Sequence, residues 1–277
     1  MEIHRGAPAQ VISAWLLGYI GLGLFAGFFA GLLGVGGGGI MVPVLTMLFA
    51  AQGMPQEHVV HLALGTSMAT IVFASVSSLR AHHRHGAVLW PVVKSIAPGI
   101  VLGTLVGAQF AARLPTKPLA IFFAAFMAYV SVQMIANIKP RPSRELPGTG
   151  GMFAAGAGIG GVSALVAIGG GSLTVPFLAW CNVKVHQAIG TSSAIGFPIA
   201  LAGTVGYLLS GQGNSGMPPG SLGFIHLPAL LGTVLPSMLM APVGARLAHR
   251  LPVATLKKIF AGVLVFLSAK MLHSLFG

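Results

Sequence analysis

The sequence predicts an all-α membrane protein that crosses the bilayer many times and consists of two related halves. Hydrophobic residues make up 55% of the 277 residues and charged residues only 6%, whereas soluble domains carry about 25% charged residues. Ten hydrophobic runs alternate with short breaks rich in glycine, proline or charged residues. Three blocks of sequence from the first half recur in the same order in the second. These observations argue against a water-soluble enzyme.

The hydrophobic runs define about ten expected helical segments, and a helix needs about 20 apolar residues to cross the hydrocarbon core. The first run follows His4 and Arg5, as in a signal peptide, but it is longer than the roughly 7 to 15 residues of a signal-peptide core. We therefore expect it to remain as the first span. The expected segments are 13–34, 39–51, 59–79, 88–112, 118–136, 151–168, 172–181, 187–210, 225–248 and 254–275.

A charged, proline-rich stretch at 139–148 divides the chain near its middle, because proline interrupts helices. We expect a first transmembrane repeat at 1–138, a linker at 139–149 and a second transmembrane repeat at 150–277. The recurring blocks support this division. Residues 36–45 match 169–178, residues 61–67 match 186–192, and residues 106–108 and 113–115 match 243–245 and 250–252.

Two topologies are compatible with these segments. If all ten cross, each half has five spans, so the repeats are inverted and both termini lie outside. The loop at 80–85 holds two arginines and three histidines, whereas its counterpart at 210–223 holds no lysine or arginine, as expected for loops on opposite sides. The loops near 80–86, 139–146 and 246–258 are then cytoplasmic. The alternative has re-entrant second and seventh segments, eight spans and parallel repeats; the positive-inside rule favours inverted repeats.

The distribution of charge favours an anion as cargo. The chain has no aspartate, and Glu2, Glu57 and Glu145 all lie in terminal or loop positions. Buried carboxylates are the usual proton relays and cation ligands of membrane transporters. The net charge of +12 resides mostly in loops, so it indicates membrane topology rather than nucleic-acid binding. Cys181 is the only cysteine, and we expect neither a metal site nor a cofactor.

The second and seventh segments are candidates for half-helices that bind the substrate. Each has only about 10 to 13 residues, follows a run of glycines and carries a proline, Pro43 or Pro176. A helix N-terminus attracts anions, and short Gly- and Pro-interrupted segments at matching positions are typical of transporter substrate sites. Glycines can instead serve tight helix packing, but consecutive glycines, at about 1 kcal/mol each, favour a break. The candidate residues are Gly36, Gly37, Gly38, Gly39, Gly169, Gly170 and Gly171.

A Gly-Thr-Ser motif recurs in the third and eighth segments. Its hydroxyls, in Thr66, Ser67, Thr191 and Ser192, could donate to an anion or could bond back to their own helix. With Ser172 they complete the candidate substrate site. His61 and His186 precede the motifs in register. Histidine is the side chain whose ordinary charge change falls near neutral pH, so these two are candidates for proton coupling; an interfacial or capping role is the alternative.

The paired motifs resemble those of the TauE/SafE family, also called the sulfite exporter or toluene-sulfonate-uptake permease family. The resemblance spans nearly the whole chain and is carried by residues 34–43 with 65–67 and by residues 168–176 with 190–193. It implies a permease of the bacterial or archaeal inner membrane that moves sulfite, sulfoacetate or other organosulfonates, with coupling to the proton gradient.

The expected mechanism is alternating access, in which two half-helix N-termini from opposite repeats hold the anion. A cation-coupled symporter and a non-transporting membrane subunit are the alternatives. The chain lacks the H-E-x-x-H and G-x-S-x-G motifs, so we do not expect an enzyme. The expected partners are a small anion and the lipid bilayer, with a homodimer as one option for assembly.

Overall fold

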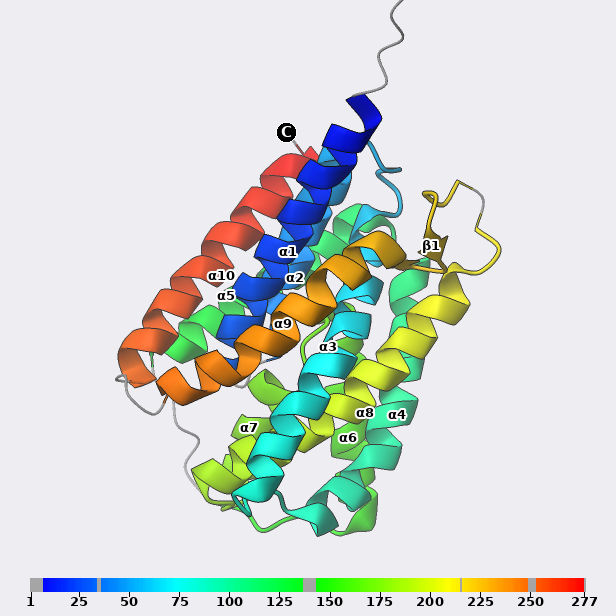
Figure 1. Ribbon diagram of the computed structural model, residues 1–277. Coiled ribbons are helices and arrows are strands. Elements are labelled where there is room, and N and C mark those ends of the chain that lie inside the picture. Colours follow the sequence, from blue (N-terminus) through cyan, green and yellow to red (C-terminus); the bar gives the residue numbers. More distant parts are fainter. Residues whose placement is uncertain (1–6, 34–35, 137–142, 215, 249–252, 277) are drawn as a thin grey trace, which may run out of the picture.

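The computed structural model is almost entirely helical, which confirms the predicted fold class (Figure 1). It describes residues 7–33, 36–136, 143–214, 216–248 and 253–276. Outside these ranges lie residues 34–35 of the first glycine motif, 139–142 of the expected linker and 250–252 of the third matching block. The exact boundaries of the two repeats stay predictions.

The described part of the chain forms ten helices and one short hairpin. The hairpin, β1 (Ser221–Leu222) and β2 (Ile225–His226), joins α8 to α9. The helices are α1 (Ala7–Leu33), α2 (Gly38–Ala51), α3 (Val59–Arg84), α4 (Trp90–Arg113), α5 (Thr116–Ile135), α6 (Thr149–Val166), α7 (Gly171–Trp180), α8 (Val185–Gly211), α9 (Leu227–Ala248) and α10 (Val253–Phe276).

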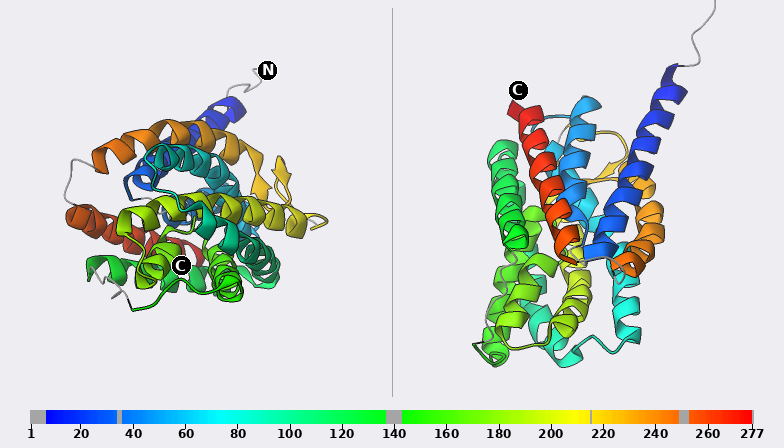
Figure 2. Two further views of the ribbon diagram at one scale, coloured as in Figure 1. Left: turned by 90° about the horizontal axis from the view of Figure 1, so that it is seen from below. Right: turned by 90° about the vertical axis from the view of Figure 1, so that its left-hand side faces the viewer.

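The helices pair across the two halves in a symmetric way. The first helix of each half packs along the fourth helix of the other, α1 along α9 and α6 along α4. The fifth helices of the two halves, α5 and α10, pack against each other, as Figure 2 shows. The third helices, α3 and α8, contact each other in the interior. The architecture therefore repeats with the halves exchanged.

Glycines at matching positions allow the first and fourth helices to approach closely. A methyl group added at Gly27 of α1 would lie 2.5 Å from the carbonyl oxygen of Ser237 in α9. At the equivalent place in the other half, a methyl group at Gly160 of α6 would overlap the carbonyl oxygen of Ile100 in α4. The role of these interface glycines is therefore tight helix packing.

The two halves run in opposite directions. In Figure 1, α3 and α9 descend, whereas their counterparts α8 and α4 ascend. Within the described ranges, eight helices are long and apolar enough to cross a membrane. With 14 and 10 residues, α2 and α7 are about 21 and 15 Å long, less than the hydrocarbon core of about 30 Å. In the described part of the chain, the structure thus combines halves of opposite direction with eight membrane-length helices, and α2 and α7 are the short half-helices that the sequence predicts.

Replacing Gly103 of α4 by alanine should destabilise the protein, because the added methyl group would overlap the carbonyl oxygen of Ala157 in α6. Overpacking of this kind costs about 1 to 3 kcal/mol. Gly158 of α6 is a matched control, since a methyl group there meets open space. Thermal unfolding in detergent should show a lower midpoint for G103A and an unchanged midpoint for G158A. Equal midpoints for the two variants would contradict the packing role.

Candidate functional site

The two glycine runs meet in the interior, backbone against backbone. A methyl group on Gly36 would lie 2.9 Å from both the Cα and the amide nitrogen of Gly169. A methyl group on Gly38 would overlap the carbonyl oxygen of Ala167. Side chains are therefore excluded at Gly36 and Gly38, and the starts of two half-helices from opposite repeats are brought together. We call this contact the glycine junction.

Each half-helix begins at a glycine with a left-handed backbone. Gly37, the N-cap of α2, has a φ of 72°, and Gly170, the N-cap of α7, has a φ of 77°. Neither helix has a side-chain cap, and the first N–H groups of a helix lack intrahelical acceptors. At the start of α7, the Gly170 and Gly171 amides donate to the carbonyl oxygens of Ile168 and Gly169. Among the described residues, the amide of Ser172 has no backbone acceptor. The junction therefore carries the partial positive charge of two helix N-termini.

A cavity of about 80 Å³ reaches the junction from one end of the protein. Gly36 and Gly169 line its inner part, and the exposed residues Ala81 and Pro242 line its mouth. The mouth lies beside the C-terminal end of α3, next to the basic loop. The cavity has space for more than one water molecule, since a water occupies about 30 Å³ in the liquid. Its lining, taken from the described residues, includes serines and His82 but no carboxylate.

Four buried hydroxyls near the half-helix starts have no hydrogen-bond partner. They belong to Ser67, Ser172, Thr174 and Ser192. Ser67 lies one turn before Ile71, and Ser192 one turn before Gly196; both later residues pack against Gly169. A buried polar group without a partner costs about 1 to 3 kcal/mol. These four hydroxyls therefore have unused hydrogen-bonding capacity, although none of the four residues lines the cavity.

The Gly-Thr-Ser motifs dock the loop that precedes the fourth helix of the other half. Thr66 accepts a hydrogen bond from the His226 amide at 2.9 Å, and Thr191 accepts one from the Leu89 amide at 3.0 Å. The glycine of each motif admits the same loop, because a methyl group there would meet a loop carbonyl oxygen. The motif therefore divides its tasks: glycine and threonine hold a loop, whereas the serine stays without a partner.

The two histidines considered for proton coupling lie in different surroundings. His61 is buried in α3, where its Nε2 lies 3.1 Å from the Ala111 carbonyl oxygen and 3.0 Å from that of Leu114. His186 is exposed in the first turn of α8. Neither lines the cavity. Their shared position in the sequence repeat therefore does not give them a shared environment.

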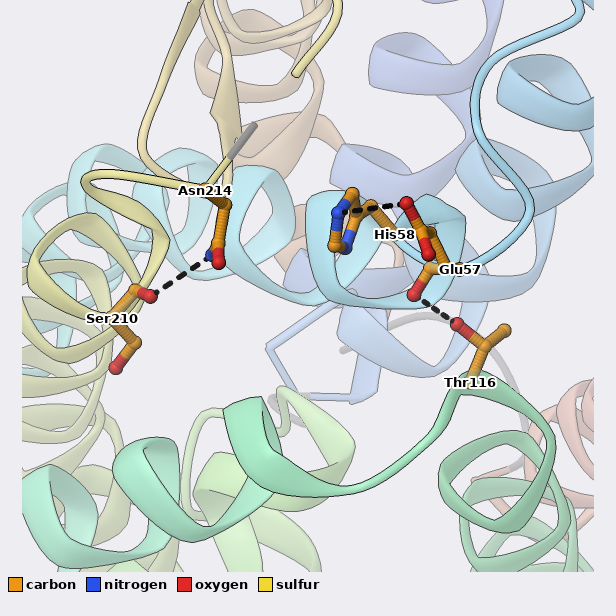
Figure 3. A network of polar contacts seen from close by, with 5 residues as sticks. All are labelled: Glu57, His58, Thr116, Ser210 and Asn214. Carbon is orange, nitrogen blue, oxygen red and sulfur yellow. Dashed lines mark hydrogen bonds and ion pairs between the residues drawn. The ribbon is translucent and has the colours of Figure 1, made fainter. Parts of the chain in front are cut away.

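The acidic residue Glu57 lies between α2 and α3, away from the cavity. Figure 3 shows its carboxylate beside His58, with the Glu57 Oε1 atom 3.5 Å from Nε2. The Glu57 backbone carbonyl accepts a hydrogen bond from Thr116 at the start of α5. The Glu57 side chain is 74% exposed, so its carboxylate faces solvent at the end of the helices and not a ligand in the interior.

The β1–β2 hairpin covers the end opposite the cavity mouth. Phe224, at its turn, is buried and stacks on His61 with ring centroids 5.1 Å apart. The imidazole of His226 lies against Phe49 and Tyr19, at 5.3 and 6.4 Å between centroids. Burial lowers the pKa of His226 to about 4, so the docked hairpin holds it uncharged near neutral pH.

Several residues around the cavity were not among the predicted site residues. Ser75, Ser78 and His82 follow one face of α3 at helical spacing and line the cavity. Polar residues at helical spacing in an apolar segment that ends in a basic loop could have predicted this polar cavity lining. Thr174 gave no such signal, because its register partner, Met41, is apolar.

The threonines and serines of the motifs should respond differently to substitution. T66V and T191V should lower the free energy of unfolding by about 1 to 3 kcal/mol, because each leaves a loop N–H without its acceptor. S67A and S192A are the matched controls and should leave stability nearly unchanged, because these hydroxyls have no partner to lose. Thermal or denaturant unfolding measures the four variants. Equal losses in both pairs would contradict the division of tasks.

Comparison with known proteins agrees with this architecture. A family model described as sulfite exporter TauE/SafE matches residues 19–271. A probable membrane transporter protein of Haemophilus influenzae is 37% identical over 255 residues, covering 90% of this chain and 95% of the relative. A probable membrane transporter protein of Methanocaldococcus jannaschii is 25% identical over 259 residues, covering 91% and 93%.

The Bacillus subtilis protein YunE, also a probable membrane transporter, is 28% identical over 213 residues, covering 70% of this chain and 78% of its own. No solved structure matches the chain. The family model extends over most of the sequence, and eight described helices can cross a membrane. The chain therefore belongs to the TauE/SafE family and is a multi-pass membrane transporter.

Proposed function

We propose that the protein carries small sulfur-containing anions, such as sulfite, sulfoacetate or other organosulfonates, across the membrane by alternating access. The observation that carries the proposal is the glycine junction, where two uncapped helix N-termini from opposite repeats meet on bare backbone. The family to which the chain belongs supports sulfite-like cargo. The substrate would bind at the junction and enter through the cavity.

The electrostatics of the junction favour an anion over a cation. Each helix N-terminus carries roughly half a positive charge, so two together present about one unit. No acidic residue among the described ones lines the cavity to offset this charge. A cation placed there would meet the positive ends of two dipoles without a counter-charge. An anion meets complementary charge and needs no ionised side chain.

The donor set suits an oxyanion. Sulfite and sulfonate groups present three oxygens that accept hydrogen bonds from several directions. The backbone amides at the start of α2 and the amide of Ser172 in α7 could donate from two sides, whereas the Gly170 and Gly171 amides already donate to the carbonyl oxygens of Ile168 and Gly169. Ser67, Ser172, Thr174 and Ser192 would add hydroxyl donors, each of which is now buried without a partner. Small residues in the rest of the cavity, such as Ala30 and Ala74, leave space for a short organic tail.

Coupling to the proton gradient is part of the same proposal. The described cavity lining offers no carboxylate to carry a proton. The proton would therefore travel on the anion itself or on His61, the buried member of the predicted histidine pair. His186 is exposed at the start of α8 and does not line the cavity. Flux driven by an imposed pH gradient is compared between H61Q and H186Q. Loss of this flux in H61Q alone would assign the proton to His61, and normal flux in both variants would assign it to the anion.

Substitution at the N-caps tests the proposed site. G37A and G170A should reduce sulfite uptake into proteoliposomes about tenfold or more, because alanine at these φ angles costs about 1 to 2 kcal/mol and shifts the amides that face the junction. Gly53 is the matched control: it has the same φ of 72° but lies in a loop with nothing nearby. G53A should transport normally.

The same assay addresses the rival cargo. Uptake of sulfite and of a short organosulfonate is measured with sodium, potassium or an impermeant cation outside. The proposal expects anion uptake that persists without sodium and potassium. A sodium- or potassium-dependent current without an anion requirement, or normal sulfite uptake by G37A and G170A, would contradict it.

A further inference from the structure

The cavity has an equivalent path on the other side of the glycine junction. Because Thr66 matches Thr191, the cavity residues Ser75 and His82 of α3 match Ala200 and Tyr207 of α8. Because Gly36 matches Gly169, Gly31 of α1 matches Ala164 of α6 in the same way. The inverted repeat thus defines a second path, from the junction toward the β1–β2 hairpin.

This second path is closed. Gly206, the counterpart of the exposed mouth residue Ala81, is buried, and Leu105, the counterpart of the exposed Pro242, is half-buried. The other residues of this path are at most 6% exposed. The buried counterparts of the cavity lining are Met68, Thr104, Ser163, Ala164, Ile199, Ala200, Ala202 and Tyr207. Two halves with the same architecture therefore present one open and one sealed path.

Tyr207 is central to the seal. Its hydroxyl donates a hydrogen bond to the Ala164 carbonyl oxygen at 2.9 Å. The Phe224 amide of the hairpin loop donates to the Tyr207 carbonyl oxygen at 3.1 Å, and the two rings meet edge to face. Met68 adds its thioether against Gly203, where a methyl group would lie 3.0 Å from the sulfur. The aromatic pair thus joins α8, α6 and the hairpin.

Two unpartnered hydroxyls lie within the sealed path. Thr104 and Ser163 are fully buried, and neither side-chain oxygen has a hydrogen-bond partner. Their counterparts in the open path, Ala241 and Ala30, line the cavity. Leaving a hydroxyl permanently without a partner costs about 1 to 3 kcal/mol. A polar lining in a closed path has a direct use if the path fills with water or substrate in another conformation.

We propose that the sealed path is the second half of the transport route, that Tyr207 is its gate, and that His82 is the equivalent gate of the open path. In the alternate conformation Tyr207 releases the Ala164 carbonyl while His82 moves toward the Gly31 carbonyl. The inference rests on transport by alternating access, but it concerns the route and not the identity of the anion.

Sequence differences between the gates set the resting conformation. Tyr207 corresponds to His82, and Phe224 corresponds to Ala87, because each of the last two contacts the glycine of a Gly-Thr-Ser motif. The rings of Tyr207 and Phe224 therefore close the hairpin side. On the basic side, the corresponding positions carry the imidazole of His82 and the methyl group of Ala87. Aromatic side chains bury large apolar areas. The protein consequently rests with the hairpin side sealed and the basic side open.

Cysteine labelling tests the gates without any transport substrate. In a C181S background, S78C reports on the open path and A200C on the sealed path. A small thiol reagent should modify S78C readily and leave A200C protected. Y207F should raise the A200C rate about fivefold, because it removes one buried hydrogen bond. The exchange H82Y with Y207H should reverse the pattern, raising A200C labelling and lowering S78C labelling.

Controls keep the result decisive. Y129H changes an exposed tyrosine on the outer surface of α5 and should leave both labelling rates unchanged. Size-exclusion profiles and unfolding midpoints identify folded variants, and Y207F provides the test if the exchanged pair fails to fold. Unchanged A200C labelling in folded Y207F, or a pattern that the exchange does not reverse, would overturn the gate assignment. Labelling as expected with no sulfite flux would instead contradict only the proposed substrate.

Discussion

The direct contact between two peptide backbones in the interior of a membrane protein is the constraint on which the rest of this structure depends. Only glycine at Gly36 and Gly38 permits it, because any side chain would overlap Gly169 or Ala167. The helical backbone is interrupted at both glycine runs, so the half-helices α2 and α7 begin in the interior without side-chain caps. Non-helical backbone at membrane depth is tolerated where it is buried in protein or lines a cavity, and both conditions hold here.

The glycine-lined interfaces between α1 and α9 and between α6 and α4 hold this contact in position. Since α1 and α6 lead directly into the two glycine runs, their close packing across the halves determines where the runs meet. The same set of contacts occurs twice with the halves exchanged. Under the proposed alternating access, such a protein would have two equivalent paths to one central site, and a few side chains would decide which path is closed.

Much of the architecture could be predicted from the sequence, because its signals are local. Consecutive glycines followed by a short apolar run predicted the half-helices, and the recurrence of those runs predicted two related halves. The lengths of the second and seventh helices were also predictable, since about 10 to 13 residues were expected and the helices have 14 and 10. The partners of Thr66 and Thr191 could not be predicted, because His226 and Leu89 are more than 100 residues distant in the chain. Likewise, His61 and His186 look equivalent in sequence, and only the surrounding helices distinguish them.

The central claim is that backbone amides at the glycine junction hold an anion. The most direct measurement is anomalous diffraction from crystals soaked in selenite, a selenium analogue of sulfite with the same arrangement of oxygens. The account predicts a selenium peak between the starts of α2 and α7, within hydrogen-bond distance of amides from both glycine runs. A peak confined to the surface or to the basic loop, with the junction free of selenium at saturating selenite, would contradict it.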